Sequence, residues 1–258
     1  MHALLARHPQ VTMASVKETC FFNDHHARGT DWYHELFPPS PWRQAVGEVS
    51  NTYLFSPEAA LRAREYNPGM RVMSCLRNPV DRTFSHWLFL MRNAELRGTF
   101  EDGLRLRPDL VDRGMYARHL SHWISALGRE RVLVLLFDRF VTDRLATYNR
   151  LLAFIGVNPA SHADMGRAEQ LAAAAPRSRF LARVVKEVAT WARRAGHPRI
   201  IQAVKNSPLP RLLYRAYGEG ERPTMRPETR AMLAGRFRED VERVSELLNE
   251  DVRVIWGI

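Results

Sequence analysis

Residues 71 to 87 read RVMSCLRNPVDRTFSHW, and this stretch decides the fold. Its apolar run Val72–Leu76 is short and partly β-branched, which is typical of a buried β-strand. Asn78 is a preferred N-cap residue and Pro79 is favoured at the first helical position, so the sequence predicts a helix that begins at Pro79 and stops near Gly98. Open α/β sheets bind their ligands where a strand runs into a helix in this way.

Two polar side chains flank the start of this predicted helix. Arg77 lies at the end of the strand, and Ser85 follows eight positions later, about two turns into the helix. The first helical turn offers backbone N–H groups and a partial positive charge, which favour an anion. Arg77 and Ser85 are therefore candidates for a phosphate site. The alternative is that Arg77 pairs with a carboxylate and Ser85 is an ordinary surface hydroxyl.

The segment Arg77–Trp87 resembles the 3'-phosphate-binding segment of sulfotransferases that use 3'-phosphoadenosine 5'-phosphosulfate (PAPS). The family pattern is Arg-Asp/Asn-Pro-x-x-Arg-x-Tyr/Phe-Ser, and the likeness is to the heparan sulfate sulfotransferases and their bacterial relatives. The resemblance implies that Arg77 and Ser85 bind the 3'-phosphate of the donor. It also implies one α/β domain over residues 1–258, with a parallel central sheet flanked by helices in the P-loop-kinase-like sulfotransferase fold.

A second segment, Val16–Asn23, resembles the Lys-Glu-x-His-Phe-Phe segment of the same family, with Cys20 where many relatives have histidine. The glutamate of that segment is the family's catalytic base, which implies this role for Glu18. The chemistry requires a base, because the acceptor hydroxyl or amine loses a proton as it attacks the sulfur. Without the resemblance, a single glutamate is more often a surface charge.

Two further segments carry weaker likenesses. Val46–Leu54 resembles the family's Gly-Glu-Lys-Ser/Thr-Pro-x-Tyr segment, with Val49 in place of the lysine that often faces the acceptor. Arg177 lies where the second nucleotide-contacting loop of the family often falls, so the resemblance implies a contact with the 3'-phosphate. A basic loop explains Arg177 equally well.

The largest departure of the chain from the family pattern concerns the phosphosulfate-binding loop. The family's phosphosulfate-binding loop, of the Lys/Arg-x-Gly-Thr-Thr type, follows a first β-strand. Neither precedes Met1, and the loop does not occur elsewhere in residues 1–258. That loop supplies positive charge and backbone donors to the transferred group, so we expect an N-terminally incomplete chain that transfers sulfate poorly. An alternative function is a non-catalytic binder of adenosine 3',5'-bisphosphate, or a truncated, inactive homologue.

The charge is unevenly placed along the chain. The protein has 258 residues, of which 45% are hydrophobic, and a net charge of +10. Between Arg177 and Arg215 there are ten Lys/Arg residues and one acid, Glu187. Such a segment attracts nucleic acid, anionic lipid or an acidic substrate. A basic nucleic-acid or membrane-surface protein, with peripheral membrane contact, is thus a second alternative. Steering of a multiply charged nucleotide suffices as an explanation, so no specific nucleic-acid partner is expected.

The cysteines, the histidines and the apolar runs indicate which metal sites, disulfides and membrane segments to expect. Cys20 and Cys75 form neither a disulfide framework nor a zinc pattern, and the histidines are scattered, so no metal is expected. No apolar run of the sequence approaches membrane-spanning length, and we expect a cytoplasmic protein. The resulting prediction is a PAPS-dependent transferase that moves a sulfuryl group to a hydroxyl or amine. A carbohydrate, a lipid or a small metabolite is the acceptor, and the oligomeric state is open.

Capping and proline signals predict the remaining elements. Arg131–Phe137 is a nearly continuous apolar run, which is typical of a strand covered on both faces. Hydroxyl residues and prolines mark the starts of further helices. These starts are Ser56-Pro57, Thr99, Thr142 and Pro227.

Overall fold

The computed structural model describes residues 1–39, 44–165 and 221–258, with the short stretches 174–176, 184–185, 187–188, 190–191 and 214–216. The chain divides into two compact units, each described by itself. Unit 1 comprises Met1–Leu76, His119–Glu169 and Gly196–Gln202, and unit 2 comprises Arg77–Arg118, Gln170–Ala195 and Ala203–Ile258. That residues 1–258 form a single sulfotransferase domain stays a prediction, since two compact units can belong to one domain.

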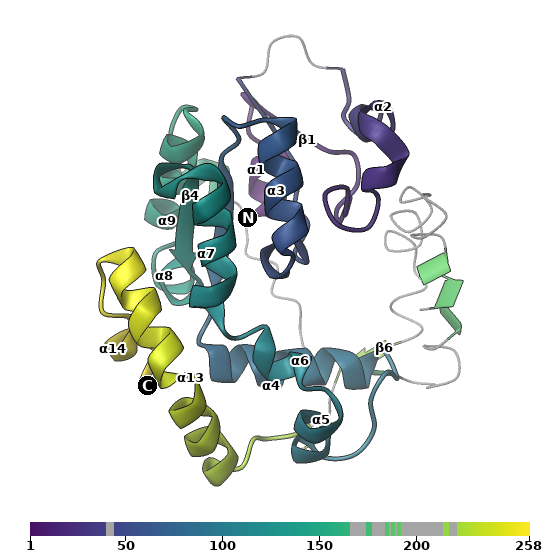
Figure 1. Ribbon diagram of the computed structural model, residues 1–258, viewed down its shortest axis with the longest axis vertical. Helices are drawn as coiled ribbons and strands as arrows, with labels where there is room; N and C mark the ends of the chain where they lie inside the picture. Colours follow the sequence, from purple (N-terminus) through teal and green to yellow (C-terminus); the bar gives the residue numbers. More distant parts are fainter. Residues whose placement is uncertain are drawn as a thin grey trace. The chain divides into compact units, whose positions relative to one another are not determined.

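Unit 1 is an α/β arrangement built on two short parallel sheets (Figure 1). β1 (Val11–Met13) pairs with β2 (Ala45–Gly47), and β3 (Val72–Leu76) pairs with β4 (Val132–Leu136). Around them lie α1 (His2–Leu5), η1 (His26–Arg28), α2 (Gly29–His34), η2 (Tyr53–Phe55), α3 (Pro57–Tyr66), most of α7 (Tyr116–Leu127), η3 (Arg129–Arg131), α8 (Phe137–Thr142), α9 (Arg144–Ile155) and η4 (His162–Met165). The predicted α/β class, with parallel strands flanked by helices, is confirmed.

The core of unit 1 lies where β1 and β4 meet the helices α1 and α9. All five residues of β4 are buried, as its continuous apolar run predicts, and β4 lies beside α8 and α9 (Figure 1). The register with β3 runs from Val72 opposite Val132 to Leu76 opposite Leu136. The buried cluster comprises Leu4, Leu5, Val11, Met13, Leu133, Leu135, Tyr148, Leu151, Leu152, Val157 and Met165.

Unit 2 is mainly helical. Its elements are α4 (Pro79–Arg92), α5 (Phe100–Leu106), α6 (Asp109–Asp112), the antiparallel pair β5 (Ala174–Pro176) and β6 (Tyr214–Ala216), α13 (Pro227–Leu248) and α14 (Val252–Trp256). Trp87 of α4 packs against Phe100 of α5, with ring centroids 5.6 Å apart. A Cβ atom at Gly103 would lie 2.5 Å from the Trp87 ring, so the close packing of α5 on α4 requires glycine there. α13 buries Leu233, Phe237, Val241 and Val244 completely.

Among the described residues, no helix combines the length and apolar character needed to cross a membrane. Arg177 and most of the basic segment up to Arg215 lie outside the described residues.

Candidate functional site

Asn78 caps α4, as predicted, and also ties the start of this helix to the last one. Its Oδ1 atom accepts hydrogen bonds from the backbone N–H groups of Val80 at 2.9 Å and Asp81 at 3.3 Å. Its Nδ2 atom donates to the carbonyl oxygen of Trp256 at 2.7 Å. Asn78 is buried, and both ends of its amide have partners, so the N-cap and the α14 contact stabilise each other.

Tyr116 fixes the backbone on the other side of this junction. Its hydroxyl donates to the carbonyl oxygen of Arg77 at 2.9 Å, and its ring centroid lies 6.0 Å from that of Trp256. Tyr116 is buried, and burial raises its pKa well above the usual value, so the hydroxyl keeps the proton it donates. The backbone that carries the Arg77 side chain is therefore held from two directions.

Arg77 and Ser85, the predicted phosphate ligands, both belong to unit 2. Arg77 is half-buried and directly precedes the N-cap, whereas Ser85 is exposed on the second turn of α4. The N–H groups of Val80 and Asp81, which belong to the helical turn expected to favour an anion, already donate to Asn78 Oδ1. A 3'-phosphate at this helix start would depend mainly on the side chains of Arg77 and Ser85.

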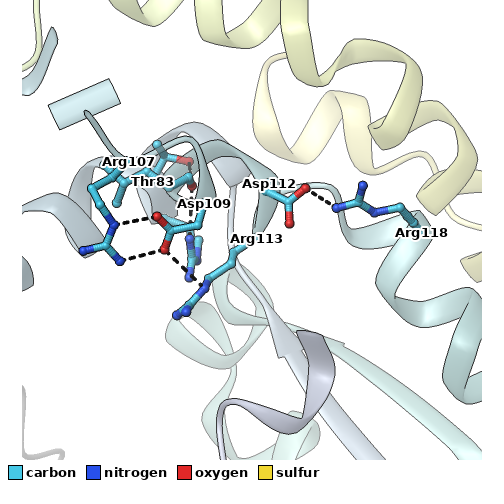
Figure 2. Close-up of polar contacts among 8 residues, drawn as sticks. Thr83, Arg107, Asp109, Asp112, Arg113 and Arg118 are labelled. Carbon is cyan, nitrogen blue, oxygen red and sulfur yellow. Dashed lines mark hydrogen bonds and ion pairs between the residues drawn. The ribbon is translucent and has the colours of Figure 1, made fainter. Parts of the chain in front are cut away.

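A basic cluster lies further along α4 and was not predicted from the sequence. Arg82 donates to the carbonyl oxygen of Leu110 at 3.2 Å. Figure 2 shows Asp109 bonded to Arg107, with N···O distances of 2.8 and 2.9 Å, and paired with Arg113 at 3.8 Å. In the same view, Thr83 donates to backbone oxygens beneath the cluster, and Arg118 pairs with Asp112. Two guanidinium groups, those of Arg107 and Arg113, thus share the carboxylate of Asp109.

His86 lies in the field of this cluster. Burial, followed by the positive charges of Arg82 and Arg113, lowers the pKa of His86 to about 4. The imidazole is therefore neutral at pH 7. Its place one turn after Arg82 on α4 follows from the sequence, but its environment depends on Arg113, which comes from another segment.

This low pKa makes stability depend on pH. The folded pKa of His86 lies below the unfolded value of 6.5, so the unfolded chain binds a proton that the folded chain does not. We expect this contribution to be fully present above pH 6.5 and to be lost as the pH falls to about 4. The loss is about 2–3 kcal/mol of unfolding free energy after allowance for partial exposure.

Urea unfolding at pH 7 and pH 4.5 measures this contribution, because His86→Gln should lose less stability between the two pH values than the wild type. The exposed His162, changed in the same way, is the matched control. An equal loss of stability in His86→Gln and in the wild type would contradict the expectation.

Glu18, the predicted base, belongs to unit 1 and is held by the loop after β2. Its backbone has φ of +64°, a left-handed conformation that costs a non-glycine residue about 1 kcal/mol. Its N–H group donates to the carbonyl oxygen of Val49 at 2.9 Å. The two carboxylate oxygens accept from the backbone N–H of Asn51 at 2.9 Å and from its side-chain amide at 2.8 Å. Asn51, which stands where the family pattern has proline, was not predicted.

The carboxyl group of Glu48 lies beneath this loop. It accepts hydrogen bonds from the hydroxyls of Tyr53 at 2.5 Å and Ser50 at 2.7 Å, with Tyr33 further away at 3.4 Å. Burial raises the pKa of Glu48, and the hydrogen bonds from Tyr53 and Ser50 oppose that shift. The same burial raises the pKa of both tyrosines, which keeps their hydroxyls protonated. The positions of Glu48, Ser50 and Tyr53 match the family's Gly-Glu-x-Ser-x-x-Tyr spacing. This match is the sequence feature from which the cluster could have been predicted.

The predicted site residues are thus distributed over both units. Glu18 lies in unit 1 and Arg77 and Ser85 lie in unit 2, so the base and the phosphate ligands are described separately. Arg177 lies outside the described residues. In the part of the chain that the structure describes, no group of three or more His, Cys, Asp or Glu side chains is arranged to hold a metal ion.

A hollow of about 520 Å³ runs along β2 in unit 1. The rings of Tyr33, Phe37 and Tyr66 line it, together with Arg71. Neither Glu18 nor the Arg77–Ser85 pair contributes to its walls, so we assign it no part in catalysis.

The chain belongs to the sulfotransferase family, because a family model described as a sulfotransferase domain matches residues 1–181. It is 28% identical over 179 residues to the bifunctional heparan sulfate N-deacetylase/N-sulfotransferase 1 of Mus musculus, covering 61% of this chain and 20% of that protein. It is 28% identical over 162 residues to the human heparan sulfate glucosamine 3-O-sulfotransferase 6, covering 59% and 47%. The matches thus span less than half the length of either relative.

A solved structure confirms the sulfotransferase fold. The sulfotransferase of Alicyclobacillus acidocaldarius superposes with a TM-score of 0.68 at 23% identity, covering 99% of this chain and 92% of that one. At this identity the likeness concerns the fold alone.

Proposed function

We propose that the protein is a PAPS-dependent sulfotransferase that transfers a sulfuryl group to a hydroxyl or amine of a carbohydrate. The observation that carries this proposal is the Arg77–Ser85 segment at the start of α4, in a chain that matches the sulfotransferase family model. The carbohydrate class is supported by the names of the relatives, which are heparan sulfate N- and glucosamine 3-O-sulfotransferases. The cytoplasmic location stays a prediction.

In this mechanism the residues of the chain position charge and move one proton. PAPS supplies an activated sulfuryl group whose leaving group is adenosine 3',5'-bisphosphate. Arg77 and Ser85 hold the 3'-phosphate, and Arg177 is proposed as a further contact. Glu18, oriented by Asn51, takes the proton from the acceptor oxygen or nitrogen as the new bond to sulfur forms and the bond to the leaving phosphate breaks. Catalysis then rests on positioning and charge stabilisation.

The direct test is a transfer assay on the full chain. The protein is incubated with PAPS and N-desulfated heparan sulfate, and both sulfated product and released adenosine 3',5'-bisphosphate are measured. A lipid and a phenolic acceptor serve as comparison. We expect release of the bisphosphate that depends on the polysaccharide, with little release on the lipid or the phenolic acceptor.

Two other results would contradict the proposal. Binding of the bisphosphate without turnover on any acceptor would indicate a non-catalytic nucleotide binder. Strongly salt-dependent binding to polyanions, with no preference for the 3'-phosphate, would indicate a basic surface protein.

A further inference from the structure

We propose that Glu48 is a positioning residue for Glu18. With Ser50 and Tyr53 it holds the segment Thr19–Phe22 in the conformation that presents the Glu18 carboxylate. This inference rests on the proposed function, in which Glu18 takes the acceptor proton.

The segment that carries Glu18 has a backbone that needs external support. Glu18 has φ of +64° and Cys20 has φ of +51°, so two non-glycine residues within three positions adopt the left-handed region. Such conformations persist where the surroundings determine them, and they cluster at functional sites. The surroundings of this segment come from the loop after β2.

Two hydroxyl oxygens accept backbone N–H groups of the segment. Ser50 Oγ accepts from the N–H of Cys20 at 3.0 Å, and the Tyr53 hydroxyl oxygen accepts from the N–H of Phe22 at 3.2 Å. The hydroxyl of Thr19 lies 3.1 Å from that of Tyr53 and 3.4 Å from that of Ser50. The bonds from the N–H groups of Cys20 and Phe22 fix two backbone positions within four residues of Glu18.

Glu48 decides the direction of these bonds. The Ser50 and Tyr53 hydroxyls both donate to the carboxyl oxygens of Glu48, so their protons point toward Glu48. Both hydroxyl oxygens then present their lone pairs to the N–H groups of Cys20 and Phe22. Without Glu48, either hydroxyl could point its proton toward the N–H group of Cys20 or Phe22. Two donors would then face each other, and the hydrogen bond would be lost.

Aromatic packing anchors the end of the same segment. The ring of Phe21 stacks on Tyr33 at 4.3 Å, and that of Phe22 meets Tyr53 edge-on at 5.6 Å. Both phenylalanines are buried. The hydrogen bonds and the rings together leave the Glu18 carboxylate, bonded to Asn51, as the half-exposed polar end of a rigid unit.

The test compares two tyrosines of this cluster. Tyr53→Phe removes the hydroxyl that links Glu48 to Phe22, whereas Tyr66→Phe removes one that bonds to His34 at 2.8 Å while its ring also meets Phe22 edge-on. We expect Tyr53→Phe to lower kcat about tenfold with the KM for PAPS unchanged, because a displaced Glu18 carboxylate is no longer correctly oriented toward the acceptor proton. Tyr66→Phe should stay within twofold of the wild type.

A double variant separates positioning from general destabilisation. In the Glu18→Gln background, Tyr53→Phe should cause no further fall in kcat, because its effect acts through Glu18. Glu48→Gln, which keeps an acceptor oxygen for Tyr53, should retain more activity than Glu48→Ala. A tenfold fall on top of Glu18→Gln, or equal behaviour of Tyr53→Phe and Tyr66→Phe, would overturn the inference.

Amide hydrogen exchange tests the same bonds without catalysis. We expect the N–H of Phe22 to exchange at least tenfold faster in Tyr53→Phe than in Tyr66→Phe, and unchanged exchange would overturn the inference. Full activity of Glu18→Gln, by contrast, would show that Glu18 is not the base, and Glu48 would then have no base to position. The exchange measurement would still show whether the N–H of Phe22 bonds to the Tyr53 hydroxyl.

Discussion

Replacing Glu18 by glutamine is expected to lower kcat for sulfuryl transfer by about a hundredfold or more, with little change in donor binding. Glutamine has nearly the same shape and keeps one acceptor oxygen for Asn51, but its amide does not take a proton from the attacking group. The change therefore removes the chemistry and retains most of the contacts that hold the side chain at 2.8–2.9 Å from Asn51.

The measurement is the initial rate of sulfated product at saturating PAPS, with donor affinity determined by calorimetry. Glu65→Gln, at an exposed glutamate of α3 in the same unit, is the matched control and should match the wild type. Wild-type kcat in Glu18→Gln would move the role of base to another residue.

Replacing Arg77 by alanine is expected to weaken binding of adenosine 3',5'-bisphosphate by about 1.5–3 kcal/mol, or roughly ten- to a hundred-and-fiftyfold. The N–H groups of Val80 and Asp81 are bonded to Asn78, so these two donors of the helix start do not replace the lost guanidinium. The backbone at Arg77 is held through Tyr116, so the truncation should leave the junction in place.

Calorimetry with the bisphosphate and with adenosine 5'-phosphate isolates the 3'-phosphate, because Arg77→Ala should affect the first ligand and spare the second. Arg71→Ala, just before the amino end of β3, is the matched control. If Arg77→Ala bound both ligands as the wild type does, the phosphate site would lie elsewhere.

Local signals carried the prediction of the fold furthest. β3 occupies Val72–Leu76 and α4 begins at Pro79, because an apolar run, an N-cap and a proline act through neighbouring residues. Ser56 accepts the N–H of Ala59, and Thr99 forms a capping box with Asp102, for the same reason.

Predictions of helix ends were less successful. α4 ends at Arg92, before the expected stop at Gly98, because Ala94 adopts φ of +57° and Glu95 bonds back to the carbonyl oxygen of Leu90 at 2.9 Å. α9 is capped by Asp143, whereas Thr142 ends α8. Both residues are good N-caps, and the choice depends on where the preceding helix stops.

The residues of the candidate site could be predicted where they belong to a sequence motif. The protonation of a residue could not be predicted where it depends on neighbours from other parts of the chain. Glu18, Arg77 and Ser85 follow from their segments, although their roles stay predictions. The neutral state of His86 depends on Arg113, and the raised pKa of Glu48 depends on burial beneath the loop that carries Tyr53. Both pKa shifts arise from the tertiary environment, which the spacing of residues along the chain does not predict.

The hydrogen bond from Asn78 to Trp256 has a consequence for synthesis of the protein. The two residues are 178 positions apart, so the ribosome adds most of the protein between making the donor and making its acceptor. During that interval the side chain of Asn78 can cap the start of α4, but its Nδ2 atom does not yet have the carbonyl oxygen of Trp256 as an acceptor. The amino-terminal end of α4 therefore reaches its final hydrogen bonding late in translation, and this long-range contact should be among the slow steps of folding.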